Sequence, residues 1–544
     1  MLALRKVEVL IIWFLMVPPA VGVSFPVPFQ ALTPGEQQAD LAYESGMKLL
    51  REKRYREALD QFQLLEKDKP QLPQGYSGEG LALALMGRLE DATHVLSKAL
   101  DIDPTFWVAR RGLGIIDWQL KKKDEAANEL RTIVKLFPDD SAVNAILGQY
   151  ESEHGNYPQA SAYFEKAKVE VAADVRLSLM AAEAHVKTGK QSRAKDILET
   201  LIANPTLTPQ QRFQLGWQLG EAGDYQKSIQ VLVSLPEDFP DKFERGYSIA
   251  LAYYKDGQYS NCIKVLSDLK NRQIIRPELF SLLGAAEENG HNTLEAYNAF
   301  REGIYAFPTD DENYLNITTV SAAHLNYDLA AQILTSGTRL IPNDYKLYLA
   351  RGVVFTLGRH LESAHADYEK ALALAPNEGE VYVALGICYM DQNKFDEAAA
   401  TFRQGILHQP KDALLHYFLA DSLFREGISV DTPGYREALS AVESSLAFNP
   451  DFPYAYLQRA RLELMRPQVD KAVEDLERAR SLAPDSREIS YQLAIAYRQA
   501  GRKAEAEKLF KTVSEASEKD AAEFRGGQLR DVIITLSNPA HSAE

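Results

Sequence analysis

Cysteine is almost absent from this chain, which has two cysteines and four tryptophans among its 544 residues. A fold stapled by disulfides needs a larger, regularly spaced set of cysteines, so that class of protein is excluded. The apolar run near the N-terminus, residues 9–17, is also shorter than the ~20 residues that a membrane-spanning helix needs. The stability of this chain must therefore come from the packing of ordinary side chains.

Basic residues are outnumbered by acidic ones, 60 to 76, which gives a formal net charge of −16. Nucleic-acid binding depends on cations that neutralise phosphates, so we expect no nucleic-acid partner. The one conspicuous basic run, Lys121-Lys122-Lys123, falls in a turn between predicted helices, where we expect it to be solvated. The acidic surplus also disfavours a lipid surface as partner, so membrane contact is expected only from an N-terminal anchor.

Sequence patterns that carry catalysis are missing or incomplete. Gly75-Tyr76-Ser77-Gly78-Glu79 approaches a nucleophile elbow, but Glu79 stands where the second glycine belongs and no strand precedes it. His360 and His365 flank a glutamate in the wrong order for the zinc-binding helix motif. No glycine-rich loop could cradle phosphates. We therefore expect no catalytic residues, no metal site and no cofactor, and hence no enzyme.

Small residues recur instead at a regular spacing. Twelve alanines share one register, nearly always 34 residues apart, and Ser228 and Cys262 fill the two gaps. A period of this length indicates stacked pairs of helices, each too small to fold alone. The alanines are Ala58, Ala92, Ala126, Ala160, Ala194, Ala296, Ala330, Ala364, Ala398, Ala438, Ala472 and Ala506.

Three further positions keep the same register. A bulky apolar residue follows each alanine by four positions, as Phe62 follows Ala58, so both lie on one face of a second helix. A glycine or alanine, such as Gly46, recurs in each first helix except that of the ninth repeat, which has Thr318, and would let the two backbones approach closely. Proline, such as Pro70, follows many second helices and ends them.

This pattern resembles the tetratricopeptide repeat family, which has a small residue at position 8, Ala at 20, a bulky residue at 24 and Pro at 32. Residues 39–520 hold fourteen such repeats, with six extra residues near 428–433 in the twelfth. The resemblance implies an all-α superhelix, a solenoid of helix-turn-helix units, which we expect to run without interruption. Cys262 and Cys388 belong to non-neighbouring repeats, so they cannot pair in one chain.

The two ends differ from the repeats. Residues 1–22 combine a basic start, a short apolar core and small residues at the exit, which predicts a cleaved secretory signal or an N-terminal anchor. We therefore expect an exported protein, periplasmic or extracellular, with inner-membrane anchoring as the alternative. Residues 521–544 are expected to form a C-terminal cap over the last repeat, broken at Gly526-Gly527, and a disordered tail from Ser537.

The resemblance also implies where a partner binds, because first-helix positions 2, 5, 9, 12 and 13 line the inner groove of such superhelices. No repeat carries the Lys at 5 with Asn at 9 of the two-carboxylate clamp, so an apolar or aromatic mode is favoured. The candidate partner-binding residues are Trp118, Phe213, Trp217, Tyr247, Leu251, Tyr254, Val383, Ile387, Met390, Tyr417 and Phe424.

The sequence thus predicts a non-catalytic scaffold that binds partner proteins or extended peptides in its groove, in a bacterial cell envelope. Two alternatives stay open. Tyrosine and tryptophan faces also suit sugars, so the chain could bind a glycan during polymer export. It could also be the regulatory subunit of an enzyme complex. The oligomeric state is left open.

Overall fold

A computed structural model of the chain describes residues 34–467, 469–512 and 519–537, and every regular element in these ranges is an α-helix. This confirms the predicted all-α fold. The chain divides into two compact units, an N-terminal unit of residues 1–256 and a C-terminal unit of residues 257–544. The 34-residue register continues across the boundary, so the sequence gives no sign of the division.

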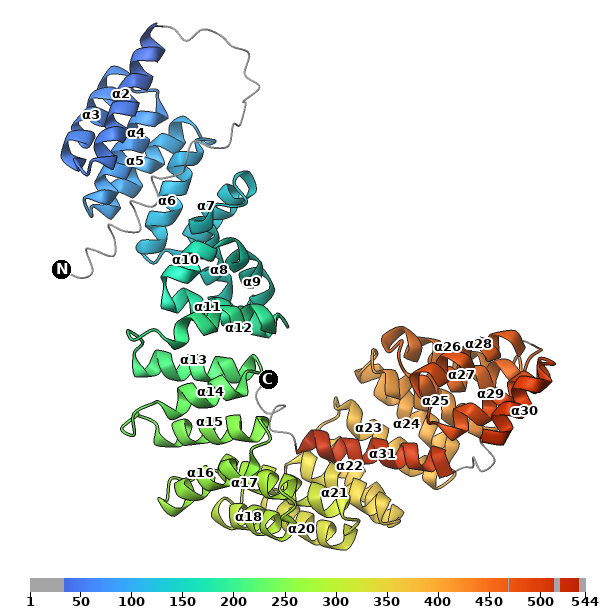
Figure 1. The fold of residues 1–544 in the computed structure, drawn as a ribbon. Coiled ribbons are helices and arrows are strands. Elements are labelled where there is room, and N and C mark those ends of the chain that lie inside the picture. Colours follow the sequence, from blue (N-terminus) through green and yellow to red (C-terminus); the bar gives the residue numbers. More distant parts are fainter. Residues whose placement is uncertain (1–33, 468, 513–518, 538–544) are drawn as a thin grey trace. The chain divides into compact units, whose positions relative to one another are not determined.

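The N-terminal unit is built from pairs of antiparallel helices in chain order (Figure 1). Its described helices are α2 (Pro34–Arg51), α3 (Tyr55–Asp68), α4 (Pro73–Leu85), α5 (Leu89–Ile102), α6 (Trp107–Gln119), α7 (Lys123–Leu136), α8 (Ser141–Glu153), α9 (Tyr157–Lys166), α10 (Lys168–Ala173), α11 (Val175–Lys187), α12 (Gln191–Ile202), α13 (Pro209–Glu221), α14 (Tyr225–Val233) and α15 (Lys242–Lys255).

The C-terminal unit continues the same pattern and ends with an additional helix, α31. Its described helices are α16 (Tyr259–Asn271), α17 (Pro277–Asn289), α18 (Thr293–Ala306), α19 (Glu312–Ala323), α20 (Tyr327–Leu340), α21 (Tyr345–Leu357), α22 (Leu361–Leu374), α23 (Gly379–Asp391), α24 (Phe395–His408), α25 (Ala413–Glu426), α26 (Pro433–Phe448), α27 (Pro453–Leu464), α28 (Val469–Leu482), α29 (Arg487–Gln499), α30 (Lys503–Thr512) and α31 (Lys519–Leu536).

Helix starts follow the repeat register closely. From Tyr55 to Phe395, every second helix of a pair begins 34 residues after the second helix before it. Within each unit, the first helices of successive pairs also contact one another, as α13 contacts α15 and α21 contacts α23. Each unit therefore presents a continuous surface built from first helices, which we call its first-helix face.

The repeated small residues set the distance between paired helices. A Cβ added to Gly386 would lie 2.2 Å from the ring of Phe402, and one added to Gly284 would lie 2.3 Å from the ring of Phe300. Both rings are buried, as are all twelve alanines of the 34-residue series. The large residue of each second helix thus fills the space that a small residue leaves on the first helix.

Two pairs depart from the common geometry. In the fourth repeat, which lacks the terminal proline, the second helix is interrupted at Ala167 and continues as the six-residue α10. In the twelfth repeat, residues 427–432 join α25 to α26, whereas three residues join α23 to α24. Three of the six extra residues of that repeat thus lengthen the turn, where they disturb stacking least, and the other three lengthen α25 and α26.

The C-terminal helix corrects two expectations. Helix α31 continues through Gly526-Gly527 without a break, so the expectation of a broken cap is wrong, and of the tail expected to be disordered only Ser537 is described. The helix also does not sit simply on the last pair. It contacts the first helices α19, α21 and α23 as well as α29, and Figure 1 shows it beside α21 to α23. Residues 538–544 lie outside the described ranges.

The predicted signal or anchor segment, residues 1–22, also lies outside the described ranges. Among the residues that are described, none of the helices is both long enough and apolar enough to cross a bilayer.

Candidate functional site

Five of the candidate residues gather on the first-helix face of the N-terminal unit. Phe213 and Trp217 lie on α13, and Tyr247, Leu251 and Tyr254 lie on the adjacent helix α15. Phe213 and Tyr247 occupy equivalent repeat positions, 34 residues apart, and so do Trp217 and Leu251. We call these five residues the aromatic patch. Trp217 is 37% exposed and the other four are half-buried, so the patch is accessible to a partner.

Neighbouring rings hold the aromatic patch in place. The ring of Phe213 stacks on that of Phe239, with 5.3 Å between centroids, and Phe239 is buried in the connection before α15. The ring of Tyr247 stacks on the buried Phe243 one turn away, at 5.5 Å. Rings fixed in this way lose little conformational entropy when a partner binds.

Trp118 does not belong to this patch. It lies on α6, which packs against α4, α5, α7 and α8, well before α13 in the stack. The side chain is half-buried, and the Lys123 Nζ lies 5.5 Å from its ring centroid. Lys123 and Lys122 of the basic run also pair with Glu153 and Asp117, at 2.6 and 3.5 Å. Trp118 is therefore an isolated aromatic residue beside neutralised lysines.

The candidate residues of the C-terminal unit are mostly inaccessible. Val383, Ile387 and Met390 on α23, and Tyr417 on α25, are each at most 5% exposed. Only Phe424 keeps a half-buried side chain. The sequence placed these residues on the first-helix face, which is correct for their helices, but the expectation that they are exposed is wrong. Neighbouring first helices pack against α23 and α25, and α31 adds to this cover, because it contacts α23 and its Phe524 meets the ring of Tyr417.

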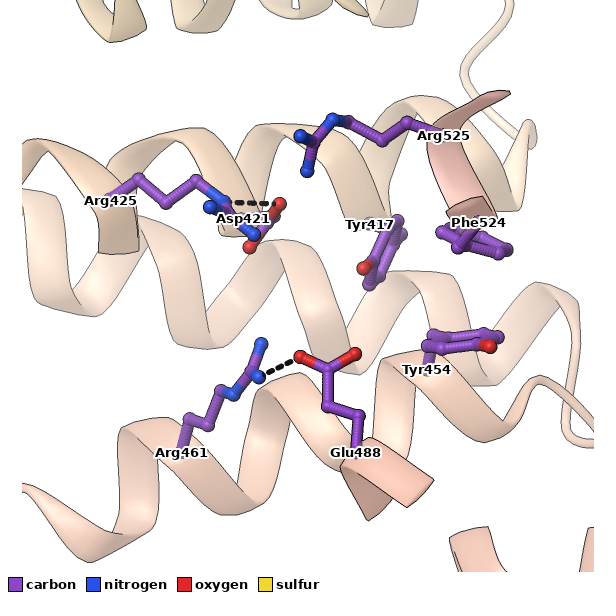
Figure 2. A pocket seen from close by; sticks show the side chains of 8 residues that line it. All are labelled: Tyr417, Asp421, Arg425, Tyr454, Arg461, Glu488, Phe524 and Arg525. Carbon is purple, nitrogen blue, oxygen red and sulfur yellow. Dashed lines mark hydrogen bonds and ion pairs between the residues drawn. The ribbon is translucent and has the colours of Figure 1, made fainter. Parts of the chain in front are cut away.

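A small hollow remains beneath the first turns of α31 (Figure 2). It has space for about one water molecule. Its walls come from α25, α27, α29 and α31, and the residues that line it are Tyr417, Asp421, Arg425, Tyr454, Arg461, Glu488, Phe524 and Arg525.

Phe524 closes the aromatic side of this hollow. Its ring stacks on that of Tyr454 with 4.0 Å between centroids and meets the ring of Tyr417 edge-on at 5.8 Å. Burial raises the pKa of Tyr417 well above its ordinary value, so its phenol stays neutral. Tyr417 is therefore suited to packing and not to proton transfer.

Ion pairs cross the polar side of the hollow. Arg425 Nε donates to Asp421 Oδ2 at 2.9 Å, Arg461 pairs with Glu488, and Arg525 Nε lies 3.2 Å from Asp391 Oδ1. Within the described residues, Asp421 Oδ1 accepts no hydrogen bond although Asp421 is only 2% exposed. A buried carboxylate oxygen left in this state is unfavourable, so the polar side of the hollow is incompletely satisfied.

The described residues give little support for catalysis. They contain no group of three or more His, Cys, Asp or Glu side chains placed to hold a metal ion. Burial raises the pKa of Cys262 to about 12 and also raises that of Cys388, so neither thiol is a ready nucleophile at neutral pH.

One polar contact in the N-terminal unit has the residue types of a nucleophile and a base. Ser161 Oγ lies 2.9 Å from His185 Nδ1, and Lys190 Nζ donates to Ser161 Oγ at 3.0 Å. Both Ser161 and His185 are buried, and burial lowers the pKa of His185. A substrate cannot reach this pair, which instead ties α9 to α11.

Sequence reasoning missed the hollow and the place of α31. A signal was present, because Leu529, Val532, Ile533 and Leu536 follow one another at helical spacing and define one apolar stripe. Apolar residues at the partner-facing positions of α23 and α25 were a second signal. Together they indicate a helix lying on that face, but Gly526-Gly527 argued against one.

Comparison with known proteins agrees with the repeat geometry. The tetratricopeptide repeat family model matches residues 83–150, 359–421 and 468–528. No curated protein matches the chain by sequence.

Solved structures that resemble the chain include yeast Tom70, at 16% identity and a TM-score of 0.41, covering 88% of this chain and 99% of that one. A tetratricopeptide repeat protein from Parabacteroides merdae has 16% identity and a TM-score of 0.36, covering 47% of this chain and 98% of that one. MamA has 25% identity and a TM-score of 0.27, covering 33% of this chain and 94% of that one.

The TM-scores are low, so the assignment depends on the family model and on the helix pairs themselves. The three matched segments lie in both units, and the same pairing and the same register occupy the residues between them. The chain therefore contains tetratricopeptide repeats in both units.

Proposed function

We propose that this chain is a non-catalytic scaffold that binds partner proteins or extended peptides on its first-helix faces. The observation that carries the proposal is the aromatic patch. It places three accessible aromatic rings and a leucine, together with the ring of Phe213, on two adjacent first helices. Large aromatic side chains at accessible positions are the usual anchors of protein recognition.

The chemistry of the patch favours an apolar or aromatic ligand side chain. Positions 5 and 9 of the sixth and seventh repeats are Phe213 with Trp217, and Tyr247 with Leu251. None of these carries a positive charge that could pair with a terminal carboxylate. An extended peptide would instead insert apolar side chains between rings that the fold already holds in position.

Selection from a random peptide library on the full chain tests this proposal. We expect enriched peptides to carry aromatic or large aliphatic residues, and Trp217→Ala and Tyr254→Ala to weaken their binding about tenfold or more each. Tyr305→Ala is the matched control, because Tyr305 is 78% exposed on the second helix α18. Equal loss in all three variants, or no loss in the first two, would reject the patch as the binding surface.

The same protein should be tested against an array of released glycans, because exposed tyrosine and tryptophan faces also suit sugar rings. Binding to glycans but to no peptide, abolished by Trp217→Ala, would replace a protein partner with a polysaccharide. Binding to peptides alone supports the proposal as stated.

Export to a bacterial cell envelope is a second part of the proposal, supported by the composition of residues 1–22. Expression of the full chain in a Gram-negative host, followed by fractionation and N-terminal sequencing, tests it. A mature protein that begins near residue 23 in the periplasm is expected. An intact N-terminus in the cytoplasm would contradict it.

A further inference from the structure

The last helix of the chain occupies the first-helix face of the C-terminal unit, far from its own place in the sequence. Arg525 on α31 pairs with Asp391 on α23, 134 residues earlier. Thr319 Oγ1 on α19 donates a hydrogen bond at 2.9 Å to Ser537 Oγ, which lies 218 residues later in the chain. A residue in the first half of α31 and the residue that follows its last turn thus contact first helices, on the face where the resemblance to other repeat proteins places a ligand.

The surface beneath α31 is mainly apolar, so contact with a protein partner is more favourable there than contact with water. Val383, Ile387 and Met390 of α23 share one cluster with Leu529, Val532 and Ile533 of α31. Leu529, Val532 and Ile533 are buried, so release of α31 would expose apolar side chains of this cluster, which soluble proteins rarely leave uncovered. We refer to this surface, on α19, α21, α23 and α25, as the helix groove.

We propose that the helix groove is a docking site for an amphipathic helix of a partner protein, and that α31 is the chain's own occupant, which such a partner displaces. The proposal rests on the proposed function and assigns a class of partner to the C-terminal unit. The first-helix faces of the two units would then bind different ligands, because the aromatic patch of the N-terminal unit is open whereas the helix groove of the C-terminal unit is filled by α31.

The contacts of α31 define the chemistry of that partner. It needs an apolar stripe with the spacing of Phe524, Leu529 and Ile533 to fill the cluster. It also needs a basic residue near the position of Arg525, which lies 3.2 Å from Asp391. A second donor within reach of Asp421 would improve on α31, because Asp421 Oδ1 accepts no hydrogen bond from the described residues.

Helix α31 is itself poorly suited to permanent docking. Gly526 and Gly527 lie side by side within it, and glycine weakens a helix relative to alanine. No packing contact requires them: a Cβ on Gly527 would meet nothing within 4 Å, and one on Gly526 would meet only the flexible end of Arg530 at 3.6 Å. These glycines lower the free energy needed to release α31 from the groove.

The first test is binding of a labelled synthetic peptide of residues 519–537 to the full chain, followed by fluorescence anisotropy. In the Ile533→Asp chain a charge replaces a side chain that is 1% exposed, so α31 should leave the groove. We expect this chain to bind the peptide at least tenfold more tightly than the unmodified chain does.

Ile534→Asp provides the matched control, because the neighbouring Ile534 is 52% exposed and points away from the groove. We expect this chain to bind the peptide as the unmodified chain does. A peptide that itself carries Ile533→Asp should not bind either chain. Equal affinity of the Ile533→Asp and unmodified chains for the native peptide would overturn the proposal.

The second test uses a variant that should fold at least as well as the unmodified chain, so a folding defect cannot account for its result. Gly526→Ala with Gly527→Ala adds helix-favouring residues where there is room for them, so α31 should hold the groove more firmly. We expect the peptide to bind this chain about tenfold more weakly than the unmodified chain. Unchanged or tighter binding would contradict displacement.

Size-exclusion chromatography of the unmodified chain separates a partner helix from exchange between copies. A monomer that binds the peptide supports the proposal. A dimer that the Ile533→Asp substitution abolishes would show that a second copy's α31 is the natural occupant, and would overturn a separate partner. None of these outcomes depends on Trp217 or Tyr254, so failure here and failure of the proposed function are distinguishable.

Discussion

At the scale of single residues, the contact between Gly386 and Phe402 shows how the repeat controls helix spacing. The Phe402 ring is fully buried, and it lies where the side chain of any larger residue at 386 would have to go. We predict that Gly386→Ala lowers the free energy of unfolding by about 1–3 kcal/mol, because the ring has no room to move. Urea unfolding followed by circular dichroism measures this.

Gly527→Ala is the control for that prediction, because a Cβ there meets nothing within 4 Å. It should leave the unfolding midpoint unchanged or raise it slightly. If Gly386→Ala behaves in the same way, close packing against Phe402 does not set the helix spacing.

Glu312 predicts a pH dependence in the C-terminal unit. Burial, together with Asp310, raises the pKa of Glu312 from its ordinary 4.5 to about 7. Ser281, Glu278 and Asp311 also face this carboxyl. A carboxyl with a raised folded-state pKa binds more protons folded than unfolded, so its favourable contribution is present below about pH 4.5 and is lost as pH rises through about 7.

We therefore predict that Glu312→Gln stabilises the protein relative to the unmodified chain at pH 8 more than at pH 5, because glutamine stays neutral. Thermal unfolding across this range measures the difference. Glu443→Gln, at an exposed glutamate of α26, should show no such trend. If the unfolding temperatures of the Glu312→Gln and unmodified chains differ by the same amount at every pH from 5 to 8, the carboxyl is ionised in the folded state over this whole range.

At the scale of elements, the turn between paired helices repeats one backbone feature. From Lys53 to Asn393, the residue with positive φ recurs every 34 positions, whether or not it is glycine. Leu325 has φ 58° and is 70% exposed, so it bears the strain of this conformation without a packing gain.

We predict that Leu325→Gly raises the free energy of unfolding by about 0.5–1 kcal/mol, since relief of strain exceeds the added entropy of the unfolded chain. The equivalent turn residue Gly155 has φ 72° and open space around it, so Gly155→Ala should destabilise by about 1 kcal/mol. If both substitutions changed the free energy of unfolding in the same direction, backbone conformation would not explain their effects.

Sequence predicted the paired helices well because their signals are local and repeated. The Ala58 and Phe62 positions recur in every repeat, and the helix starts keep the same 34-residue register. Helix α31 was not predicted as one helix, because Gly526-Gly527 is unfavourable locally and only docking on distant helices compensates. Val383, Ile387 and Met390 lie at groove positions but are buried, because α21, α25 and α31 all pack against α23.

At the scale of the whole molecule, the two cysteines report on the integrity of the C-terminal unit. Cys262 and Cys388 are buried, and burial raises the pKa of Cys262 to about 12. We predict that neither thiol reacts with a thiol-specific reagent at pH 7.5 in the native protein, and that both react in urea. Rapid labelling of either one under native conditions would show that the repeats around it open far more readily than their packing implies.

Binding of a partner on the first-helix faces is tested most directly by site-specific photocrosslinking. A benzoylphenylalanine replaces Trp217 of α13 in one sample and Tyr305 of α18 in another, each mixed with a library-selected peptide. We predict that the peptide crosslinks from position 217 and not from position 305. Crosslinking from position 305 with equal yield, or from neither position while binding persists, would contradict the account.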